Sequence, residues 1–248
     1  MIKNSKTKGF DFTIIIPAWN EEDMIEETIN TIENYFKKRN FELLIVNDGS
    51  TDSTKTIVEK LMKRYSNLRL INHKKNLGIG AALKTGFKNA SSNVIINMDS
   101  DLTHPIDKIE EMVDMVKKGY DVVIGSRYIK GGGFREVPLF RRVISFVGGF
   151  IFFRTIFFSR IKDMTSGFRA YNKRIIKELN LKSERFEIQL EISVKIIKKN
   201  LKFKEIPIIL NVRKKGVSKF NYFKELKIYV PSLIKLFFYR WFQKEDNL

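Results

Sequence analysis

The sequence predicts an α/β fold with a mostly parallel sheet flanked by helices. The first half of the chain alternates short apolar runs, typical of strands, with segments in which apolar residues recur every three to four positions. Such alternation indicates strands joined by crossover helices, which cover both faces of the sheet. The second half is less regular and interleaves Arg and Lys with Phe, Ile and Leu.

The strands and helices of the first half are expected in strict alternation. The predicted strands are Phe12–Ile16, Phe41–Val46, Leu68–Asn72, Asn93–Met98 and Tyr120–Ile124, and the predicted helices are Glu21–Phe36, Ser53–Tyr65, Ile79–Asn89 and Ile106–Lys118. In such sheets ligands bind beyond the carboxyl ends of the strands. The polar motifs of this half follow strand ends, so we expect them to share one site.

Two aromatic-rich segments of the second half are predicted to be amphipathic helices in a membrane interface. Residues 143–158 contain Arg154 and are too short and too polar for a membrane span. Residues 226–248 combine apolar side chains with Lys and Arg, and Pro231 is expected to divide them. Their apolar sides would face the lipid and their basic sides the headgroups. The alternative is a pair of core helices in a soluble domain.

The composition limits the classes of partner. The chain has 46 basic and 28 acidic residues among 248, a net charge of +18, which favours anionic partners. Basic residues interleaved with apolar ones favour a membrane surface over a nucleic-acid groove. Cysteine is absent, which excludes disulfides and thiolate metal sites. Residues 1–12 are polar and lysine-rich, so no secretory signal is expected there.

Two carboxylates follow the fourth predicted strand. Asp99 and Asp101 are one residue apart, so in an extended segment their side chains point the same way. Like charges held this close are relieved by a proton or a cation. A hard divalent metal is a natural partner and would hold phosphate oxygens in turn. The alternative is a solvated turn.

Three other polar motifs follow strands of the first half. Asp48 lies in an acidic, glycine-containing strand–helix junction, where it could hydrogen-bond a nucleotide's base or ribose or serve only as turn and cap chemistry. Pro17 ends the first strand and precedes an acidic turn. The Gly78–Gly80 pair begins like a dinucleotide-binding loop, but Leu83 occupies the place of its third glycine, which disfavours a dinucleotide-binding dehydrogenase.

The motifs, taken in order, resemble a known family. The segments Ile16–Glu21, Val46–Asp52 and Asp99–Asp101 are similar to those of family-2 glycosyltransferases of GT-A (Rossmann-like) fold. Farther along, Thr103–Pro105, Gly125–Tyr128, Asp163–Arg169, Phe186–Ile188 and Arg213–Lys219 resemble polyprenyl-phosphate sugar synthases of the dolichyl-phosphate mannosyltransferase type. The resemblance extends from Phe12 to Lys219.

The resemblance implies a donor site. Base and ribose would be lined by Pro17, Trp19, Glu21, Val46 and Asp48, and the donor diphosphate would lie at Asp99, Ser100 and Asp101. A divalent metal, Mg²⁺ or Mn²⁺, would be held by Asp99, Asp101 and Thr103. Thr103 stands where the mannosyltransferase pattern usually has Gln, and its hydroxyl has a shorter reach than an amide oxygen.

The basic residues then acquire a role. A phosphate-monoester acceptor is largely dianionic at neutral pH and needs no strong base, which fits a chain with two histidines. The acceptor phosphate would be bound by Arg127, Arg141, Arg142, Arg213 and Lys219, and the catalytic set would be Asp101 with Arg127, Arg141, Arg213 and Lys219. Direct attack on C1 would invert the sugar's anomeric centre.

The expected protein is a metal-dependent enzyme bound peripherally at the cytoplasmic face of a membrane. It would transfer mannose from GDP-mannose to a polyprenyl or dolichyl phosphate, with or without a membrane-anchored partner subunit, and no nucleic-acid partner is expected. The alternatives are UDP-glucose or UDP-N-acetylhexosamine as donor, a glycan hydroxyl as acceptor, or a non-catalytic basic module. The GT-A domain is expected at 1–225, with a nucleotide-sugar half at about 10–128, an acceptor half at about 129–225 and a membrane-surface helix at 226–248.

Overall fold

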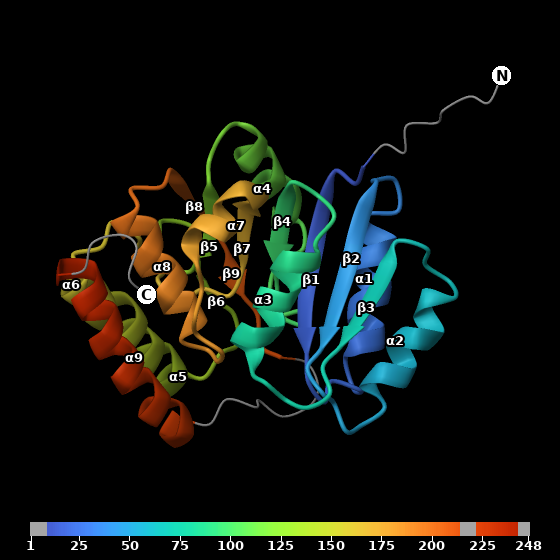
Figure 1. Ribbon diagram of the computed structural model, residues 1–248, viewed down its shortest axis with the longest axis horizontal. Helices are drawn as coiled ribbons and strands as arrows, with labels where there is room; N and C mark the ends of the chain where they lie inside the picture. The colour runs from blue at the N-terminus through green and yellow to red at the C-terminus, as the bar shows by residue number, and fades with distance from the viewer. Residues whose placement is uncertain (1–8, 214–221, 243–248) are drawn as a thin grey trace.

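The computed structural model of the chain describes residues 9–213 and 222–242 and confirms the α/β fold with a mostly parallel sheet (Figure 1). A seven-stranded sheet has the order β3-β2-β1-β4-β7-β5-β8. Its strands are β1 (Phe12–Ala18), β2 (Phe41–Asn47), β3 (Leu68–Asn72), β4 (Val94–Asn97), β5 (Val122–Ser126), β7 (Arg169–Asn172) and β8 (Phe203–Pro207).

Strand β7 is antiparallel to both of its neighbours, β4 and β5. Its first residue, Arg169, pairs with Asn97 at the end of β4 and with Ile124 near the end of β5. The chain leaves β5 at the carboxyl end of the sheet and re-enters the sheet from that end at β7. An antiparallel direction follows. The loop before β7 therefore lies beside the residues that follow β4.

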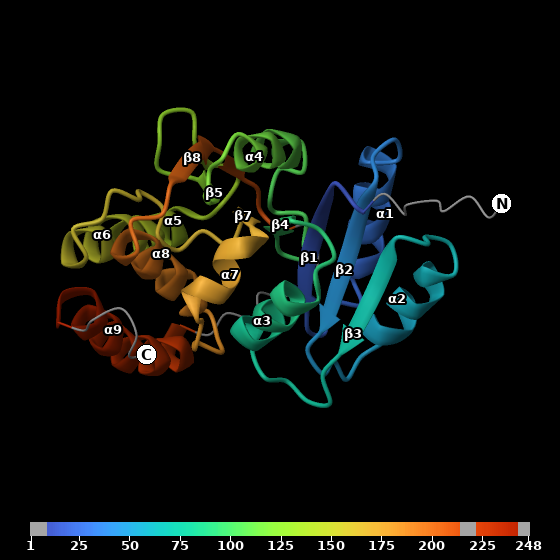
Figure 2. The same cartoon turned by 45° about the horizontal axis from the view of Figure 1, so that its top comes forward.

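Helices cover both faces of the sheet (Figure 2). One face packs against α1 (Ile25–Tyr35), α2 (Thr54–Met62) and α4 (Lys108–Lys117), and the other against α3 (Ile79–Asn89), α7 (Lys173–Leu179) and α8 (Ile188–Lys198). Successive strand residues alternate between the two cores: Ile14 and Ile16 face the first, whereas Ile15 faces the second. This period of two is that of a strand buried on both faces.

Some predicted boundaries were wrong by a few residues. The first helix begins at Ile25 and not at Glu21. The main-chain N–H of Glu21 donates to Thr54 Oγ1, and its carbonyl accepts from Met24 and Ile25, so a turn precedes the helix. Tertiary contacts with the start of α2 therefore decide where α1 begins.

The second half adds helices at one end of the molecule. A continuous helical segment consists of α5 (Leu139–Ile144), the π-helix η1 (Ser145–Phe152) and α6 (Phe153–Ile156), and it covers most of the predicted range 143–158. Two short strands, β6 (Gly133–Phe134) and β9 (Ile209–Leu210), pair in parallel. Both views place the α5–α6 segment and α9 (Tyr222–Phe242) at the end of the molecule opposite β3 (Figures 1 and 2).

Helix α9 continues through Pro231, so the predicted break there is wrong. Proline removes one helical hydrogen bond. Tertiary packing overrides that preference, because Leu236 and Tyr239 are buried in the core beside α8. No helix in the described ranges is both long enough and apolar enough to cross a membrane.

Candidate active site

A cavity of about 330 Å³ lies beyond the carboxyl ends of β4 and β5. Its walls come from segments far apart in the chain: the residues after β4, Arg127 after β5, the loop 165–167 before β7, the approach to α5, and Arg213 after β9. The topology explains this convergence, since β7 begins where β4 and β5 end. The predicted site residues that line the cavity are Asp99, Asp101, Thr103, Arg127 and Arg213.

The acid pair lies in the loop that follows β4. Thr103 donates two hydrogen bonds to Asp101 Oδ1, from its main-chain nitrogen at 3.2 Å and from its hydroxyl at 2.8 Å. The main-chain N–H of Asp99 donates to His104 Nδ1 at 3.4 Å. His104 is buried and stacks on Phe168, with 5.0 Å between the ring centroids. Thr103 thus orients one of the two carboxylates.

Asp99 lies between the cavity walls, and its pKa is raised. Burial among the cavity walls is the main cause of the raised pKa, although 43% of the Asp99 side-chain surface is accessible. The negative charge of Asp101 raises the pKa further. His104 acts in the opposite direction. A carboxylate pair held under such electrostatic strain is stabilised by a cation.

The residues present fit a hard divalent cation. Carboxylate oxygens are the ligands that Mg²⁺ prefers, and it commonly binds through one or two carboxylates together with substrate phosphates and water. A Cβ atom added to Gly167 would lie 3.6 Å from Asp99 Oδ1, so the glycine leaves space beside the carboxylate. The described ranges contain no cluster of three or more Asp, Glu, His or Cys side chains suited to a metal.

Arg127 is held by a carboxylate that the sequence analysis did not assign to it. Its Nε and Nη2 donate to the two oxygens of buried Asp163, both at 2.7 Å, and Nη2 also donates to Thr165. Burial by itself would lower the pKa of Arg127, but the Asp163 carboxylate outweighs it and the pKa is raised. Arg127 therefore carries a fixed positive charge at the cavity wall.

Arg213 connects two of the predicted motifs. Its Nη2 donates to Glu21 Oε2, and its Nη1 lies 3.9 Å from Asp101 Oδ2. The end of β1, the acid pair and the segment after β9 are thereby brought together. This contact joins residues 192 positions apart in the chain.

Other predicted donor residues lie apart from the cavity walls. Val46 is fully buried in the core cluster that includes residues of α3. Asp48 is buried, with Oδ1 accepting from Leu77 N–H and bonded to His73 Nδ1 at 2.6 Å, and Oδ2 accepting from Gly78 N–H. Both of its oxygens thus already hold the loop before α3.

The remaining residues predicted to bind the sugar donor come from the segment before α1 and from a loop that contacts α1. Pro17 is half-buried at the end of β1, and Trp19 is 38% exposed. Ser100 is buried, and its carbonyl accepts a hydrogen bond from Thr28 of α1. Their roles toward a nucleotide stay predictions.

Three predicted cations are placed less directly. Arg142 is exposed on α5, with its guanidinium carbon 5.9 Å from the Phe134 ring centroid. Arg141 lies on α5, but its side chain is outside the described part of the structure. Lys219 lies outside the described residues.

Ser145 lines the cavity, and the sequence analysis did not identify it. Its hydroxyl is 2.5 Å from the hydroxyl of Tyr128. The serine sits inside the apolar run 143–158, where nothing in the sequence pattern distinguishes it. Asp163 had a signal that could have been used, because it is an acid that opens the Asp163–Arg169 motif.

Comparison with known proteins gives two informative relatives. A dolichol-phosphate mannosyltransferase of Pyrococcus furiosus is 35% identical over 210 residues, which are 84% of this chain and 58% of the relative. A polyprenol monophosphomannose synthase of Mycolicibacterium smegmatis is 28% identical over 215 residues, 84% of this chain and 80% of the relative. The chain thus spans little more than half of the Pyrococcus protein.

Solved structures share the fold. Glucosyl-3-phosphoglycerate synthase from Mycobacterium tuberculosis, in complex with Mn²⁺ and UDP-glucose, has a TM-score of 0.65 at 17% identity, covering 93% of this chain and 79% of that one. S. aureus TarS 1-349, in complex with UDP-GlcNAc, has a TM-score of 0.63 at 20% identity, with coverage of 94% and 68%. Residues 13–179 match the family described as glycosyl transferase family 2, and this chain belongs to that family.

Proposed function

We propose that this glycosyltransferase moves mannose from GDP-mannose to a polyprenyl or dolichyl phosphate, with inversion at C1. One observation carries the proposal: a single cavity combines the acid pair Asp99 and Asp101 with the cations Arg127 and Arg213. Val137 and Pro138, just before the apolar α5–α6 segment, form part of its wall. The site thus has a side for a diphosphate and a side that adjoins an apolar surface.

The named relatives support the choice of reaction. The Pyrococcus protein is named a dolichol-phosphate mannosyltransferase and the Mycolicibacterium protein a polyprenol monophosphomannose synthase. The structural neighbours hold UDP-sugars, and one holds Mn²⁺ as well. A UDP-hexose is therefore the alternative donor.

The donor would be held by residues from both sides of the sheet end. Asp99, Asp101 and Thr103 would hold Mg²⁺ or Mn²⁺, which supplies positive charge to the departing diphosphate. The base and ribose would lie toward Pro17, Trp19, Glu21 and the β2 end with Val46 and Asp48. Thr103 fits a supporting role, since its hydroxyl bond to Asp101 Oδ1 fixes that carboxylate.

The acceptor phosphate would bind between the cations. Asp163 occupies Nε and Nη2 of Arg127, so Nη1, which has no hydrogen bond to any described residue, is the amino group left for a phosphate oxygen. A dianionic phosphate attacks C1 without a general base. His104 also lines the cavity, but its ring stacks on Phe168 and its Nδ1 already accepts the main-chain N–H of Asp99.

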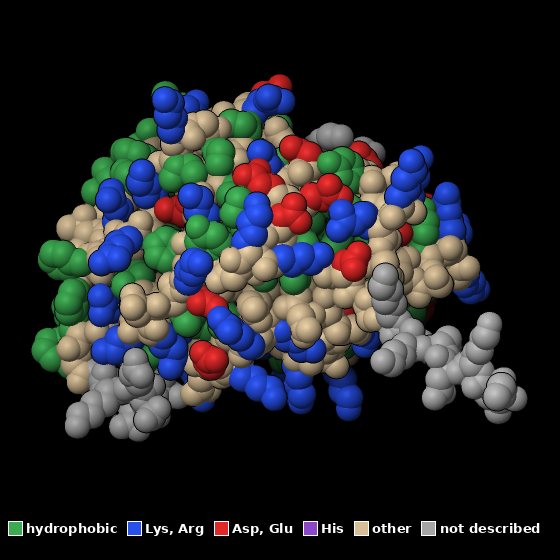
Figure 3. Space-filling view, turned by 90° about the horizontal axis from the view of Figure 1, so that it is seen from above, with side chains coloured by type: hydrophobic (Ala, Val, Ile, Leu, Met, Phe, Trp, Pro, Cys, Tyr) green, Lys and Arg blue, Asp and Glu red, His purple; other side chains and the backbone are tan. Residues whose placement is uncertain are grey.

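We place the enzyme on the cytoplasmic face of a membrane as a peripheral protein. Large apolar side chains are exposed along α5, η1 and α9, among them Phe140, Val147, Phe152, Ile234 and Phe238. Hydrophobic side chains gather at this end of the molecule, with Lys and Arg between them (Figure 3). That mixture suits an interface of acyl chains and anionic headgroups. A membrane-anchored partner subunit is the alternative anchor.

A transfer assay tests the proposal. Purified chain and a polyprenyl phosphate in detergent are supplied separately with labelled GDP-mannose, UDP-glucose or UDP-N-acetylglucosamine, with Mg²⁺, Mn²⁺ or EDTA. We expect metal-dependent transfer of label from GDP-mannose into the organic phase. Transfer of label from a UDP-sugar, with none from GDP-mannose, would show that the donor is that UDP-sugar. If polyprenyl phosphate accepts no label and a glycan hydroxyl does, the acceptor is a glycan and not a lipid phosphate.

A further inference from the structure

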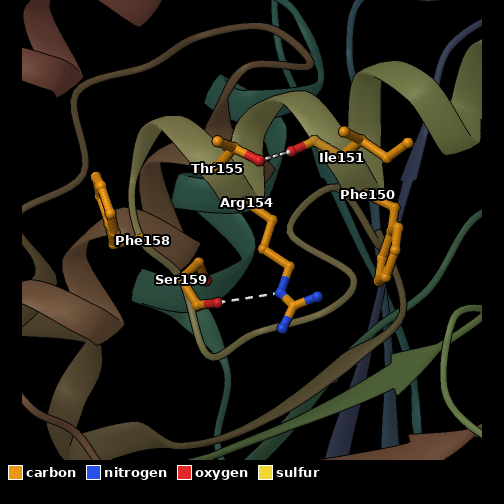
Figure 4. Close-up of a pocket in the computed structure, with 6 residues that line it drawn as sticks. All are labelled: Phe150, Ile151, Arg154, Thr155, Phe158 and Ser159. Carbon is orange, nitrogen blue, oxygen red and sulfur yellow. Dashed lines mark hydrogen bonds between the residues drawn. The ribbon is translucent and has the colours of Figure 1, made fainter.

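A second cavity, of about 340 Å³, lies along η1, α6 and the turn after α6, and none of its described lining residues lines the active site. It is lined by Phe150, Ile151, Arg154, Thr155, Phe158 and Ser159 (Figure 4). Among the described lining residues, Arg154 carries the only charged side chain. The cavity thus combines one cation with aromatic and aliphatic walls.

The Arg154 guanidinium is oriented by the protein and has donors to spare. Its Nε donates to the carbonyl oxygen of Ser159 at 3.3 Å, and its carbon lies 5.3 Å from the centroid of the Phe150 ring (Figure 4). Its two terminal amino groups, Nη1 and Nη2, donate to no described residue. They form the planar edge that binds two oxygens of a phosphate side by side.

The turn that follows Arg154 has an unusual residue at its centre. Ser159 N–H donates to the Arg154 carbonyl at 3.0 Å and Phe158 N–H to the Thr155 carbonyl at 3.3 Å, which is the hydrogen-bond pattern of a Schellman helix end. Glycine is usual at the left-handed position of that motif, but here it is Phe158, with φ of +45°. The Phe158 side chain is 76% exposed at the rim of the cavity.

The surroundings favour an anion at an apolar boundary. Residues 139–162 contain five basic residues and no acidic ones. Ile151 and Phe152 are exposed on the same helical segment, and Phe158 contacts Trp241 of α9 with 5.5 Å between ring centroids. A soluble anion would satisfy the cation but leave these apolar side chains in water. An anion that carries acyl chains satisfies both.

We propose that this cavity binds the phosphate of an anionic phospholipid headgroup in a bilayer. Nη1 and Nη2 of Arg154 donate to the two non-bridging oxygens of the phosphodiester, while Phe158 and Ile151 lie among the upper acyl chains. The site rests on the proposed membrane-surface function and is separate from the acceptor-phosphate site at Arg127. It holds the chain on the membrane by a specific headgroup contact in addition to general electrostatic attraction.

Binding to vesicles tests this site without any transferase substrate. The full chain is titrated with phosphatidylcholine vesicles that contain or lack phosphatidylglycerol, with no nucleotide sugar and no polyprenyl phosphate. A failed transfer assay therefore leaves the outcome unaffected. Arg154→Gln is expected to weaken binding to the anionic vesicles by about tenfold or more, as for a lost charge-assisted hydrogen bond.

Two variants distinguish a paired hydrogen bond made by the planar guanidinium from the simple attraction of one positive charge. Arg160→Gln removes an exposed cation six residues away and should weaken binding by at most about fivefold, the effect of one surface charge. Arg154→Lys keeps the charge but loses the two side-by-side amino groups of the guanidinium. It should bind at least about fivefold more weakly than the unsubstituted chain. Equal losses for Arg154→Gln and Arg160→Gln, or full binding by Arg154→Lys, would overturn the proposal.

A measurement on the unsubstituted chain covers the case in which a variant fails to fold. Trp241 adjoins the cavity through Phe158, so lipids held at Arg154 are near its indole. In mixed vesicles, brominated phosphatidylglycerol is expected to quench the Trp241 emission more than brominated phosphatidylcholine at equal content, with Trp241→Phe as the blank. Equal quenching by the two lipids would contradict a headgroup-specific site.

Discussion

The end of the sheet built by β1–β3 differs sharply from the end built by α5, η1, α6 and α9. In the first, buried polar groups are matched within the chain: Asp48 holds three donors, and Glu42 accepts from Thr13, Arg69 and Ser91. In the second, large apolar side chains are exposed, and Nη1 and Nη2 of the half-buried Arg154 donate to no described residue. In the first region, these buried polar groups find their hydrogen-bond partners within the chain. The second exposes the apolar side chains that the proposed membrane contact would cover.

The largest expected effect lies between these regions, at the acid pair. Asp101→Ala is expected to lower the transfer rate by roughly 10³-fold, because removal of one electrostatic contact to developing charge typically costs this much. The control is Asp107→Ala, an exposed acid six residues along the chain. Initial rates under saturating donor and Mg²⁺ measure both. Equal activity of the two variants would remove Asp101 from the chemistry.

The Arg127–Asp163 pair predicts a large loss of stability. Asp163→Asn leaves a buried guanidinium without its carboxylate and should lower the free energy of unfolding by about 3 kcal/mol, as for other broken buried pairs. Lys55→Gln breaks an ion pair whose side chains are about half exposed and should cost less than about 0.5 kcal/mol. Urea unfolding curves compare them. A loss below 1 kcal/mol for Asp163→Asn would mean that water replaces the pair.

Helix α9 predicts two outcomes on one element. Leu236 is 4% exposed and packs in the core, so Leu236→Ala should cost about 2–4 kcal/mol. Ile234 is 53% exposed, so Ile234→Ala should change the stability by no more than about 0.5 kcal/mol. Thermal unfolding of the two variants measures this. Similar losses would show that the outer face of α9 is covered in solution.

The smallest effect concerns pH and Glu42. Burial by itself would raise the pKa of Glu42, but hydrogen bonds, led by that from the Ser91 main chain, outweigh it and the pKa is lowered from 4.5. Its stabilisation is therefore full above the unfolded pKa of 4.5 and is lost as the pH falls through the lower folded value. Glu42→Gln should flatten the stability–pH curve in that window. An unchanged slope would contradict the lowered pKa.

The sequence predicted most of the first half because local patterns decide it. The runs that end at Ile16, Val46 and Asn72 are short and rich in apolar or β-branched residues, and the structure contains strands there. Strand β7 was not predicted. It has four residues, and its position depends on how the chain returns from α6. Such an insertion is a property of topology that no local pattern records.

Part of the candidate site was predicted because its residues follow strands that the sequence pattern identifies. Asp99, Asp101 and Arg127 follow strand ends, and parallel strands bring such ends together. The partner of Arg127 was missed because Asp163 is 36 residues away and reaches it through the loop before β7. Val46, which the resemblance places at the base and ribose, has its side chain buried in the core, and its role toward a nucleotide stays a prediction.

The position of β7 has a consequence for synthesis of the chain. Residue Tyr171 pairs with Ile95 on one side and with Val122 on the other, so β4 and β5 lack their common neighbour until this residue is available. Such distant pairing slows folding. A nascent chain that ends before β7 leaves one edge of β4 and both edges of β5 unpaired, and such edges are templates for aggregation. The first 128 residues are therefore not expected to form a stable fragment by themselves.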